Sequence, residues 1–342
     1  MRVRRPRYPG THPRAFHQKY KELDPGRYPA EVQKVRESGK TPAGMHVPVM
    51  LDEVLQCLQP QPGEVAVDCT LGGGGHTRAL LERVRPGGRV IGLDIDPIEL
   101  KRTEARLREE GWPPDVLTVR HANFAGLPQA LAAEGVAGAD VVIVDLGVSS
   151  MQLDNPERGF GYKGFGPLDM RMNPARGEPA SALLARVSEA ELATLLAENA
   201  DEPHAAIIAG LLTLKPLTTT HAAERAVRQG LSQALPRLSK ADIKNSIRRT
   251  FQALRIAVND EFSMLDALLR SLPHCLSPGG RAAAITFHSG EDRRVKKAFQ
   301  AGVSAGIYAE IAREVIRPSM AETRANRRAS SAKLRWAVRG GG

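Results

Sequence analysis

The feature that most constrains the fold is an alternation of short apolar runs with helical patterns. The apolar runs cover residues 64–69, 89–95, 116–121, 140–146 and 281–288. They are continuous rather than alternating in apolarity, as in strands that helices cover on both faces. Helical patterns fill the intervals at residues 77–84, 97–110 and 127–135. This repetition predicts an α/β fold with a doubly wound parallel sheet, on which ligands bind at the carboxyl ends of the strands.

The alternation stops between the fourth and fifth apolar runs. Residues 188–212, 221–233 and 247–272 have helical periodicity there, and the last stretch is expected to re-enter the sheet domain. A structureless loop of that size is implausible, so we expect an inserted small helical domain. The chain of 342 residues is long enough for two cores. We place the insertion at residues 153–249 and the sheet domain at residues 45–152 and 250–342.

The segment that precedes the first strand is basic. The chain has a net charge of +10, and residues 1–44 contain eleven lysines and arginines against four acids. This tail is rich in proline and glycine without apolar periodicity, so we expect it to be disordered. Clustered cations favour RNA phosphates, although a solvated tail or a start-site artefact fits equally well. A transit peptide fits less well, because Glu22, Asp24 and Glu31 break the acid-poor pattern.

The cysteines and the hydropathy exclude several protein classes. Cys57, Cys69 and Cys275 have neither a paired spacing nor a CxxC motif, so we expect no disulfide framework and no cysteine-rich zinc site. No cluster of histidine, cysteine and aspartate has the spacing of metal ligands, and we expect no metal. No apolar stretch approaches the length of a membrane span. We therefore expect a cytoplasmic protein.

A glycine turn follows the first predicted strand in VAVDCTLGGGGH, residues 65–76. A phosphate-binding P-loop needs a lysine that is missing here, and the dinucleotide fingerprint fails because His76 and its successors stand where a third glycine should fall. What remains is an acid at the end of one strand, a turn onto a helix, and Asp94 at the end of the next strand, where a carboxylate accepts hydrogen bonds from ribose hydroxyls. S-adenosylmethionine fits this pattern, because its sulfonium and amino groups favour an acid-lined pocket. A merely flexible turn is the alternative.

Five motifs carry a family resemblance, at residues 46–55, 68–77, 145–174, 251–261 and 287–299. The longest reads DLGVSSMQLDNPERGFGYKGFGPLDMRMNP. Together the motifs closely resemble the MraW-type 16S ribosomal RNA cytosine-N4 methyltransferases. The resemblance implies a Rossmann-like methyltransferase domain interrupted by a helical substrate domain, with S-adenosylmethionine as cofactor. It also implies 16S ribosomal RNA or the small ribosomal subunit as partner, no membrane, and leaves a homodimer open.

The same resemblance implies the residues of the cofactor site. They are Gly74, Gly75, His76, Asp94, Phe124, Asp145 and Gln152. Individual members also have ordinary interpretations, since His76 could cap a helix, Phe124 could belong to the core and Gln152 could be a solvated loop residue. Their joint position at the carboxyl ends of predicted strands favours the site.

The chemistry of cytosine N4 suggests which side chains act. The lone pair of this amino group is delocalised into the ring, so positioning and an acceptor for the amino protons must carry the reaction. We expect Asp145, with backbone carbonyls of residues 146–149, to provide that acceptor. Asp169 is a second candidate for holding the base, although it could equally pair with Arg171. Aromatic side chains available to stack on a splayed cytidine are Phe160, Tyr162 and Phe165.

Several positions depart from the family pattern. Phe165 replaces an acid, Gly290 a leucine and Arg327 a proline, while residues 199–202 replace a YGEE motif. A divergent paralogue that methylates another RNA or another substrate therefore stays open. A non-catalytic RNA-binding assembly factor, using the basic run at residues 293–297, is the other alternative.

Overall fold

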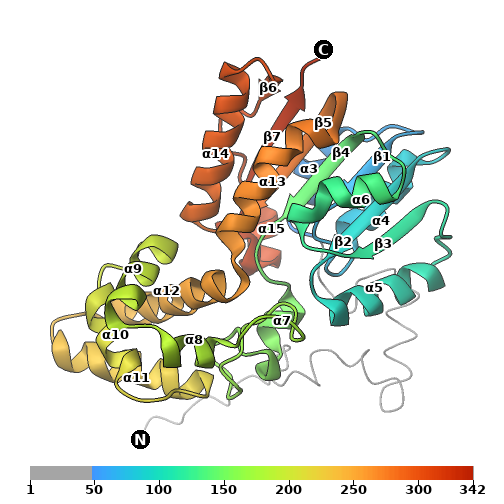
Figure 1. The fold of residues 1–342 in the computed structure, drawn as a ribbon. Helices are drawn as coiled ribbons and strands as arrows, with labels where there is room; N and C mark the ends of the chain where they lie inside the picture. The colour runs from blue at the N-terminus through green and yellow to red at the C-terminus, as the bar shows by residue number, and fades with distance from the viewer. Residues whose placement is uncertain (1–47, 342) are drawn as a thin grey trace, which may run out of the picture.

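The computed structural model describes residues 48–341, so the expectations for the N-terminal tail lie outside it. Its centre is a seven-stranded sheet with the order β3-β2-β1-β4-β5-β7-β6 (Figure 1). The strands are β1 (Val65–Asp68), β2 (Arg89–Asp94), β3 (Leu117–His121), β4 (Ala139–Asp145), β5 (Leu276–Thr286), β6 (Tyr308–Ile311) and β7 (Lys333–Arg339). Strands β1 to β5 pair in parallel, whereas β7 is antiparallel to both β5 and β6.

The five predicted strands are all present, which confirms the α/β fold with a largely parallel, Rossmann-like sheet. Strand β1 pairs with β2 on one side and with β4 on the other, so the order of the strands reverses at β1. In open parallel sheets a crevice for ligands forms at the carboxyl ends of the strands beside such a reversal. The two antiparallel strands β6 and β7 were not predicted.

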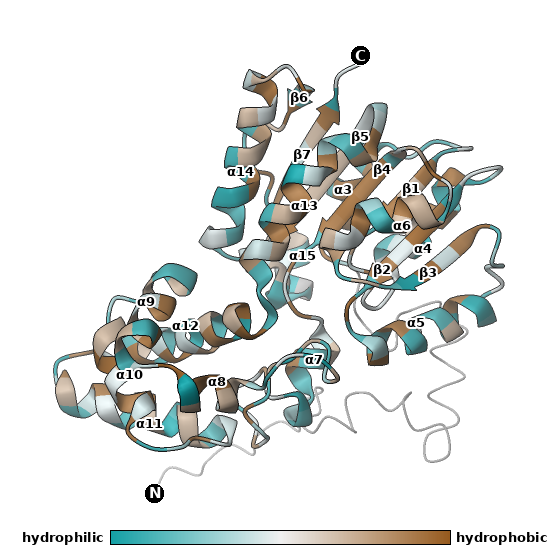
Figure 2. Ribbon diagram, in the orientation of Figure 1, coloured by the Kyte–Doolittle hydropathy of each residue, from teal (hydrophilic) through white to brown (hydrophobic). Residues whose placement is uncertain are grey.

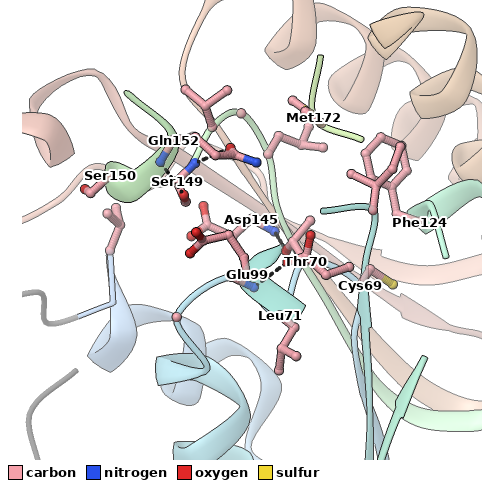
Figure 3. A pocket seen from close by; sticks show the side chains of 18 of the residues that line it. Cys69, Thr70, Leu71, Glu99, Phe124, Asp145, Ser149, Ser150, Gln152 and Met172 are labelled. Atoms are coloured by element: carbon pink, nitrogen blue, oxygen red, sulfur yellow. Dashed lines mark hydrogen bonds between the residues drawn. The ribbon is translucent and has the colours of Figure 1, made fainter. Parts of the chain in front are cut away.

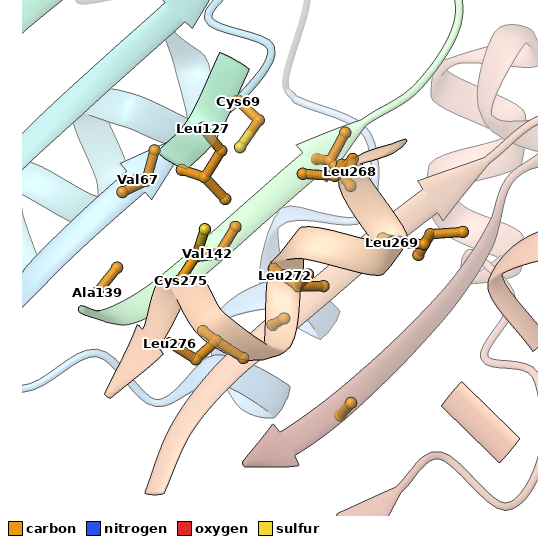
Figure 4. Packing of buried hydrophobic residues seen from close by; sticks show 14 of the residues in the cluster. Val67, Cys69, Leu127, Ala139, Val142, Leu268, Leu269, Leu272, Cys275 and Leu276 are labelled. Atoms are coloured by element: carbon orange, nitrogen blue, oxygen red, sulfur yellow. The ribbon is translucent and has the colours of Figure 1, made fainter. Parts of the chain in front are cut away.

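Helices cover both faces of the sheet, as continuous apolar strands require. One face packs against α3 (Leu51–Leu58), α4 (Gly75–Val84) and α5 (Pro97–Glu109), and the other against α6 (Leu127–Ala133), α13 (Glu261–Cys275) and α14 (Ser289–Ser304). The strands are mostly hydrophobic, whereas α14 turns much hydrophilic surface outward (Figure 2). On the second face Leu268, Leu272 and Cys275 of α13 pack beside Val142 of β4 (Figure 4).

The residues between β4 and β5 form a helical domain beside the sheet (Figure 1). It begins after the short helix α7 (Ser150–Asp154). Its helices are α8 (Ala180–Arg186), α9 (Glu189–Ala200), α10 (Ala205–Thr213), α11 (Thr220–Ala234) and α12 (Lys240–Asn259). Buried residues such as Leu196, Ile208, Val227 and Ile247 form a core of their own. This domain therefore has a hydrophobic core separate from those that flank the sheet.

Two predicted helices are each broken by an aspartate. The stretch 188–212 forms α9 and α10, separated at Asp201, and the stretch 247–272 falls into α12 and α13, separated at Asp260. Asp201 and Asp260 have φ values of 49° and 51°, in the left-handed region where a helix cannot continue. The chain thus returns to the sheet at Asp260, between two helices and not within one. Among the described residues no helix is both long and apolar enough to span a bilayer.

Candidate active site

A hollow of about 260 Å³ opens at the carboxyl ends of β1, β2 and β4. Residues from the glycine turn, from α7 and from the junction of α12 with α13 line it as well. Figure 3 shows Phe124 and Met172 on one side of this hollow and Ser150 on the other. The sheet reversal and the inserted domain therefore meet at one site.

Asp68 stabilises the glycine turn through two hydrogen bonds. Its Oδ1 accepts a hydrogen bond from the backbone N–H of Thr70 at 3.1 Å, and its Oδ2 accepts one from the Thr77 hydroxyl at 2.7 Å. Gly74 has a φ of 69°, and a Cβ at Gly75 would lie 2.2 Å from the ring of Pro48. These two glycines are needed for backbone conformation and for packing. Gly73 and Gly75 line the hollow, and Gly74 does not.

His76 ties the glycine turn to the segment that precedes α3. Its Nε2 lies 3.1 Å from the carbonyl oxygen of Val49, and because a carbonyl only accepts, Nε2 carries the proton. Burial lowers the pKa of His76, which favours the neutral ring. Its Nδ1 then faces Asp145 Oδ2 at 3.9 Å. His76 therefore fixes one wall of the hollow and does not cap α4 with its side chain.

Two acids meet at the end of β2. Asp94 Oδ2 accepts a hydrogen bond from the backbone N–H of Gly72 at 2.7 Å, and Oδ1 accepts one from the N–H of Asp96 at 2.8 Å. Burial raises the pKa of Asp94 to about 6. Glu99 also lines the hollow, and burial followed by the charge of Asp96 raises its pKa to about 7. Glu99 was not among the predicted site residues, although the sequence shows an acid in the first turn of the helix after β2.

Asp145 is the best-placed acceptor in the hollow. Its backbone N–H donates to the hydroxyl of Thr70 at 2.7 Å, which fixes the end of β4 (Figure 3). Burial, with the charges of Asp68, Glu291 and Glu322, raises the pKa of Asp145 well above its ordinary value. Its Oδ1 is buried and has no hydrogen-bond partner among the described residues. A buried carboxyl oxygen in that state is ready to accept a hydrogen bond from a ligand.

Gln152 is buried and links α7 to the end of β2. Its Oε1 accepts a hydrogen bond from the backbone N–H of Ser149 at 3.0 Å, and its Nε2 donates to Asp96 Oδ2 at 2.8 Å. Arg158 donates to the same Asp96 oxygen at 2.7 Å. Gln152 is therefore not a solvated loop residue. It lines the hollow while its side chain is hydrogen-bonded to Ser149 and Asp96.

Of the other predicted residues, the structure brings Phe124 to the hollow but not Asp169. Phe124 follows β3, lines the hollow and packs against the core beneath the sheet. Asp169 lies outside the hollow, and its two carboxylate oxygens accept hydrogen bonds from Arg171 at 2.8 and 2.7 Å. The structure thus favours the pairing with Arg171 over a role for Asp169 in holding the base.

The three candidate stacking residues differ in exposure. Phe160 is buried, with Arg158 over its ring, and Tyr162 packs edge-on against Phe251. Phe165 is 74% exposed and has the ring of His221 at 6.4 Å. Only Phe165 of these three therefore offers a free aromatic face.

The hollow is also lined by residues that were not predicted as site residues, although all but Phe262 lie within the motifs at residues 251–261 and 287–299. They are Asn259, Glu261, Phe262, Phe287 and Glu291. A Cβ at Gly290 would lie 2.6 Å from the tip of the Phe262 ring, so a larger residue at position 290 would require this ring to shift. The guanidinium of Arg294 lies 3.8 Å from the centre of the same ring. In the part of the chain that the structure describes, no group of three or more potential ligands gathers for a metal.

Comparisons of the sequence with known proteins identify the family. Residues 43–339 match the MraW methylase family. A protein of Alkaliphilus metalliredigens named ribosomal RNA small subunit methyltransferase H 2 is 47% identical over 343 residues, covering 99% of this chain and 98% of its own. A protein of Agathobacter rectalis named ribosomal RNA small subunit methyltransferase H 1 is 47% identical over 98% of this chain and 97% of its own. Both alignments reach into the segment before residue 43. The chain belongs to the MraW methylase family and is an S-adenosylmethionine-dependent methyltransferase.

Proposed function

We propose that this protein transfers a methyl group from S-adenosylmethionine to the exocyclic N4 of a cytidine in 16S ribosomal RNA, as free RNA or within the small subunit. The observation that carries the proposal is the buried, unpartnered Oδ1 of Asp145 at the floor of an acid-lined hollow. The motifs of the family and the names of the relatives support the ribosomal substrate.

The lining of the hollow fits this cofactor. Asp94 and Glu99 offer carboxylates to ribose hydroxyls, and Phe124 offers an apolar ring for the adenine. A Cβ at Gly73 would meet nothing within 4 Å, so the bare turn leaves room for the methionine part beside His76. The cofactor supplies an electrophilic methyl group on a positively charged sulfur. Acids near that charge stabilise it, because charges interact more strongly in a partly buried site than in bulk water.

Asp145 is proposed to act on the cytosine amino group. As N4 forms its bond to the methyl carbon, positive charge develops on nitrogen and one amino proton becomes acidic. A carboxylate that accepts this proton stabilises the transition state more than the bound substrate. The hydrogen bond from the backbone N–H of Asp145 to Thr70 fixes the end of β4 from which this carboxylate projects. We assign no part in this step to Asp169.

The helical domain is proposed to present the RNA. Enzymes that modify a base must take it out of its stack, and exposed aromatic rings are good partners for single-stranded bases. Phe165 is such a ring, with the exposed His221 beside it, and the exposed Arg225 lies within hydrogen-bond distance of His221. On α14, Lys296 and Lys297 are exposed, whereas Arg293 and Arg294 pair with Asp201 and Asp266. Lysines without a protein partner are the better candidates for phosphate contacts.

The test is methylation of unmodified small subunits in vitro, followed by mass spectrometry of the ribosomal RNA nucleosides. We expect N4-methylcytidine with the wild-type protein and very little with Asp145→Asn. Methyl transfer to another nucleoside would show a divergent paralogue. Tight RNA binding without methyl transfer to any nucleoside would show a non-catalytic assembly factor.

A further inference from the structure

The charged lining of the hollow is uneven. Its acids are Asp94, Glu99, Asp145, Glu261 and Glu291, and among the described residues its only lysines or arginines are Arg102 and Arg328. Arg102 lies 3.8 Å from Glu99 and thus belongs to the acids after β2. Arg328 has no comparable acid inside the hollow. Arg328 pairs with Asp154 at 2.6 Å, but Asp154 is not among the residues that line the hollow, so an anionic ligand inside the hollow would complete the pairing of Arg328.

Arg328 is held so that half of its guanidinium is unused. It lies in the short 3-10 helix η4 (Arg327–Ser331), and its Nη2 donates to Asp154 Oδ1 on α7 at 2.6 Å. Its Nη1 is buried and has no hydrogen-bond partner among the described residues. A buried donor left in this state is costly, and the planar guanidinium is well suited to bind a carboxylate.

The contacts of neighbouring segments place Arg328 on the glycine-turn side of the hollow. Just before η4, the helix α15 (Met320–Ala325) provides Glu322, whose Oε1 accepts a hydrogen bond from the Met50 N–H at 2.8 Å. The preceding residue, Val49, is bonded to His76. Ser150, at the start of the helix that ends in Asp154, lies across the hollow from Phe124 (Figure 3). Arg328 is therefore remote from the side proposed for adenine.

We infer that Arg328 binds the carboxylate of the methionine part of S-adenosylmethionine through Nη1. This carboxylate is the only anionic group of the cofactor, and the glycine turn with His76 lies on the same side. Asp154 holds the other half of the guanidinium and so fixes its direction. The inference rests on the cofactor orientation proposed above, with the ribose at Asp94.

The experiment compares two ligands by calorimetry. One is S-adenosylmethionine, and the other is its decarboxylated analogue, which lacks only the carboxylate. The variants are Arg328→Met, Arg328→Gln and the matched control Arg327→Met, because Arg327 is adjacent but exposed and outside the hollow. We expect both Arg328 variants to bind S-adenosylmethionine about 10- to 100-fold more weakly, as for a lost charged hydrogen bond, and to bind the analogue as the wild type does. Arg327→Met should bind both ligands normally.

Three results would overturn the inference. Equal loss for both ligands would mean that Arg328 acts through Asp154 on the shape of the hollow. Unchanged affinity for S-adenosylmethionine with a raised KM for RNA would assign Arg328 to a phosphate of the substrate. Equal effects of the two arginine positions would indicate general electrostatics. A wrong cofactor orientation is recognised separately, because Asp94→Ala would then leave cofactor affinity intact.

Discussion

Glu99→Gln should stabilise the ligand-free protein at neutral and alkaline pH but not at acidic pH. Burial raises the pKa of Glu99 from its usual 4.5 to about 7, so the folded protein holds this proton more tightly than the unfolded chain. The contribution of Glu99 to the stability of the folded protein is fully present below the pKa that Glu99 has in the unfolded chain. It is lost as the pH rises through the pKa that Glu99 has in the folded protein. The difference between the folded and unfolded pKa values of Glu99 corresponds to about 3 kcal/mol of stability, because one pKa unit is worth about 1.4 kcal/mol. Glutamine resembles the protonated acid and does not titrate.

Urea unfolding at pH 5 and pH 8 measures the effect. The free energies of unfolding of wild type and Glu99→Gln should nearly agree at pH 5, and the variant should be more stable by about 3 kcal/mol at pH 8. The control Glu109→Gln removes an exposed carboxylate from the same helix, and its effect should be small at both pH values. A difference between wild type and Glu99→Gln that does not change with pH would refute the reasoning.

Three further changes test other parts of the molecule. Asp94→Ala should weaken cofactor binding by roughly 1 to 3 kcal/mol in a protein that still folds, as calorimetry and circular dichroism would show. Asp145→Asn should lower the single-turnover methylation rate about 100-fold at saturating cofactor and RNA, far beyond its effect on cofactor affinity. Because burial raises the pKa of Asp145, the wild-type rate should rise with pH while the variant's rate stays flat; equal rates or parallel pH profiles would contradict the catalytic role. Deleting residues 1–44 should reduce RNA affinity and flatten its salt dependence, and an unchanged salt slope would mean that the tail takes no part.

The parallel half of the sheet could be predicted because each strand is a continuous apolar run that ends in a turn or an acid. Strand β7 escaped prediction for a physical reason. Its sequence KLRWAVR lacks the continuous apolar run that marked the other strands, because Lys333 and Arg335 interrupt it, and these two residues are accommodated by pairing with Asp292. The breaks at Asp201 and Asp260 depend on a left-handed backbone that aspartate adopts only where tertiary contacts favour it.

Some residues of the site could likewise be predicted from the sequence, and others could not. Asp94, Phe124 and Asp145 follow predicted strands, so their convergence could be deduced from the topology. Phe262 and Arg328 lie more than a hundred residues further along the chain, and no local pattern connects them with the glycine turn. Their place at the hollow depends on how α13 and η4 pack against the sheet domain. The burial of Gln152 likewise depends on Asp96, which is distant in sequence.

The acidic lining of the hollow also affects the release of the cofactor product. Methyl transfer removes the positive charge from sulfur, so the thioether product keeps the ribose contacts proposed for Asp94 and Glu99 but loses the electrostatic attraction between its sulfur and the acidic lining. The acidic lining therefore favours the charged donor over S-adenosylhomocysteine, and this difference should help the product to leave. With the cation gone, the raised pKa values of Asp94 and Glu99 favour proton uptake from solvent.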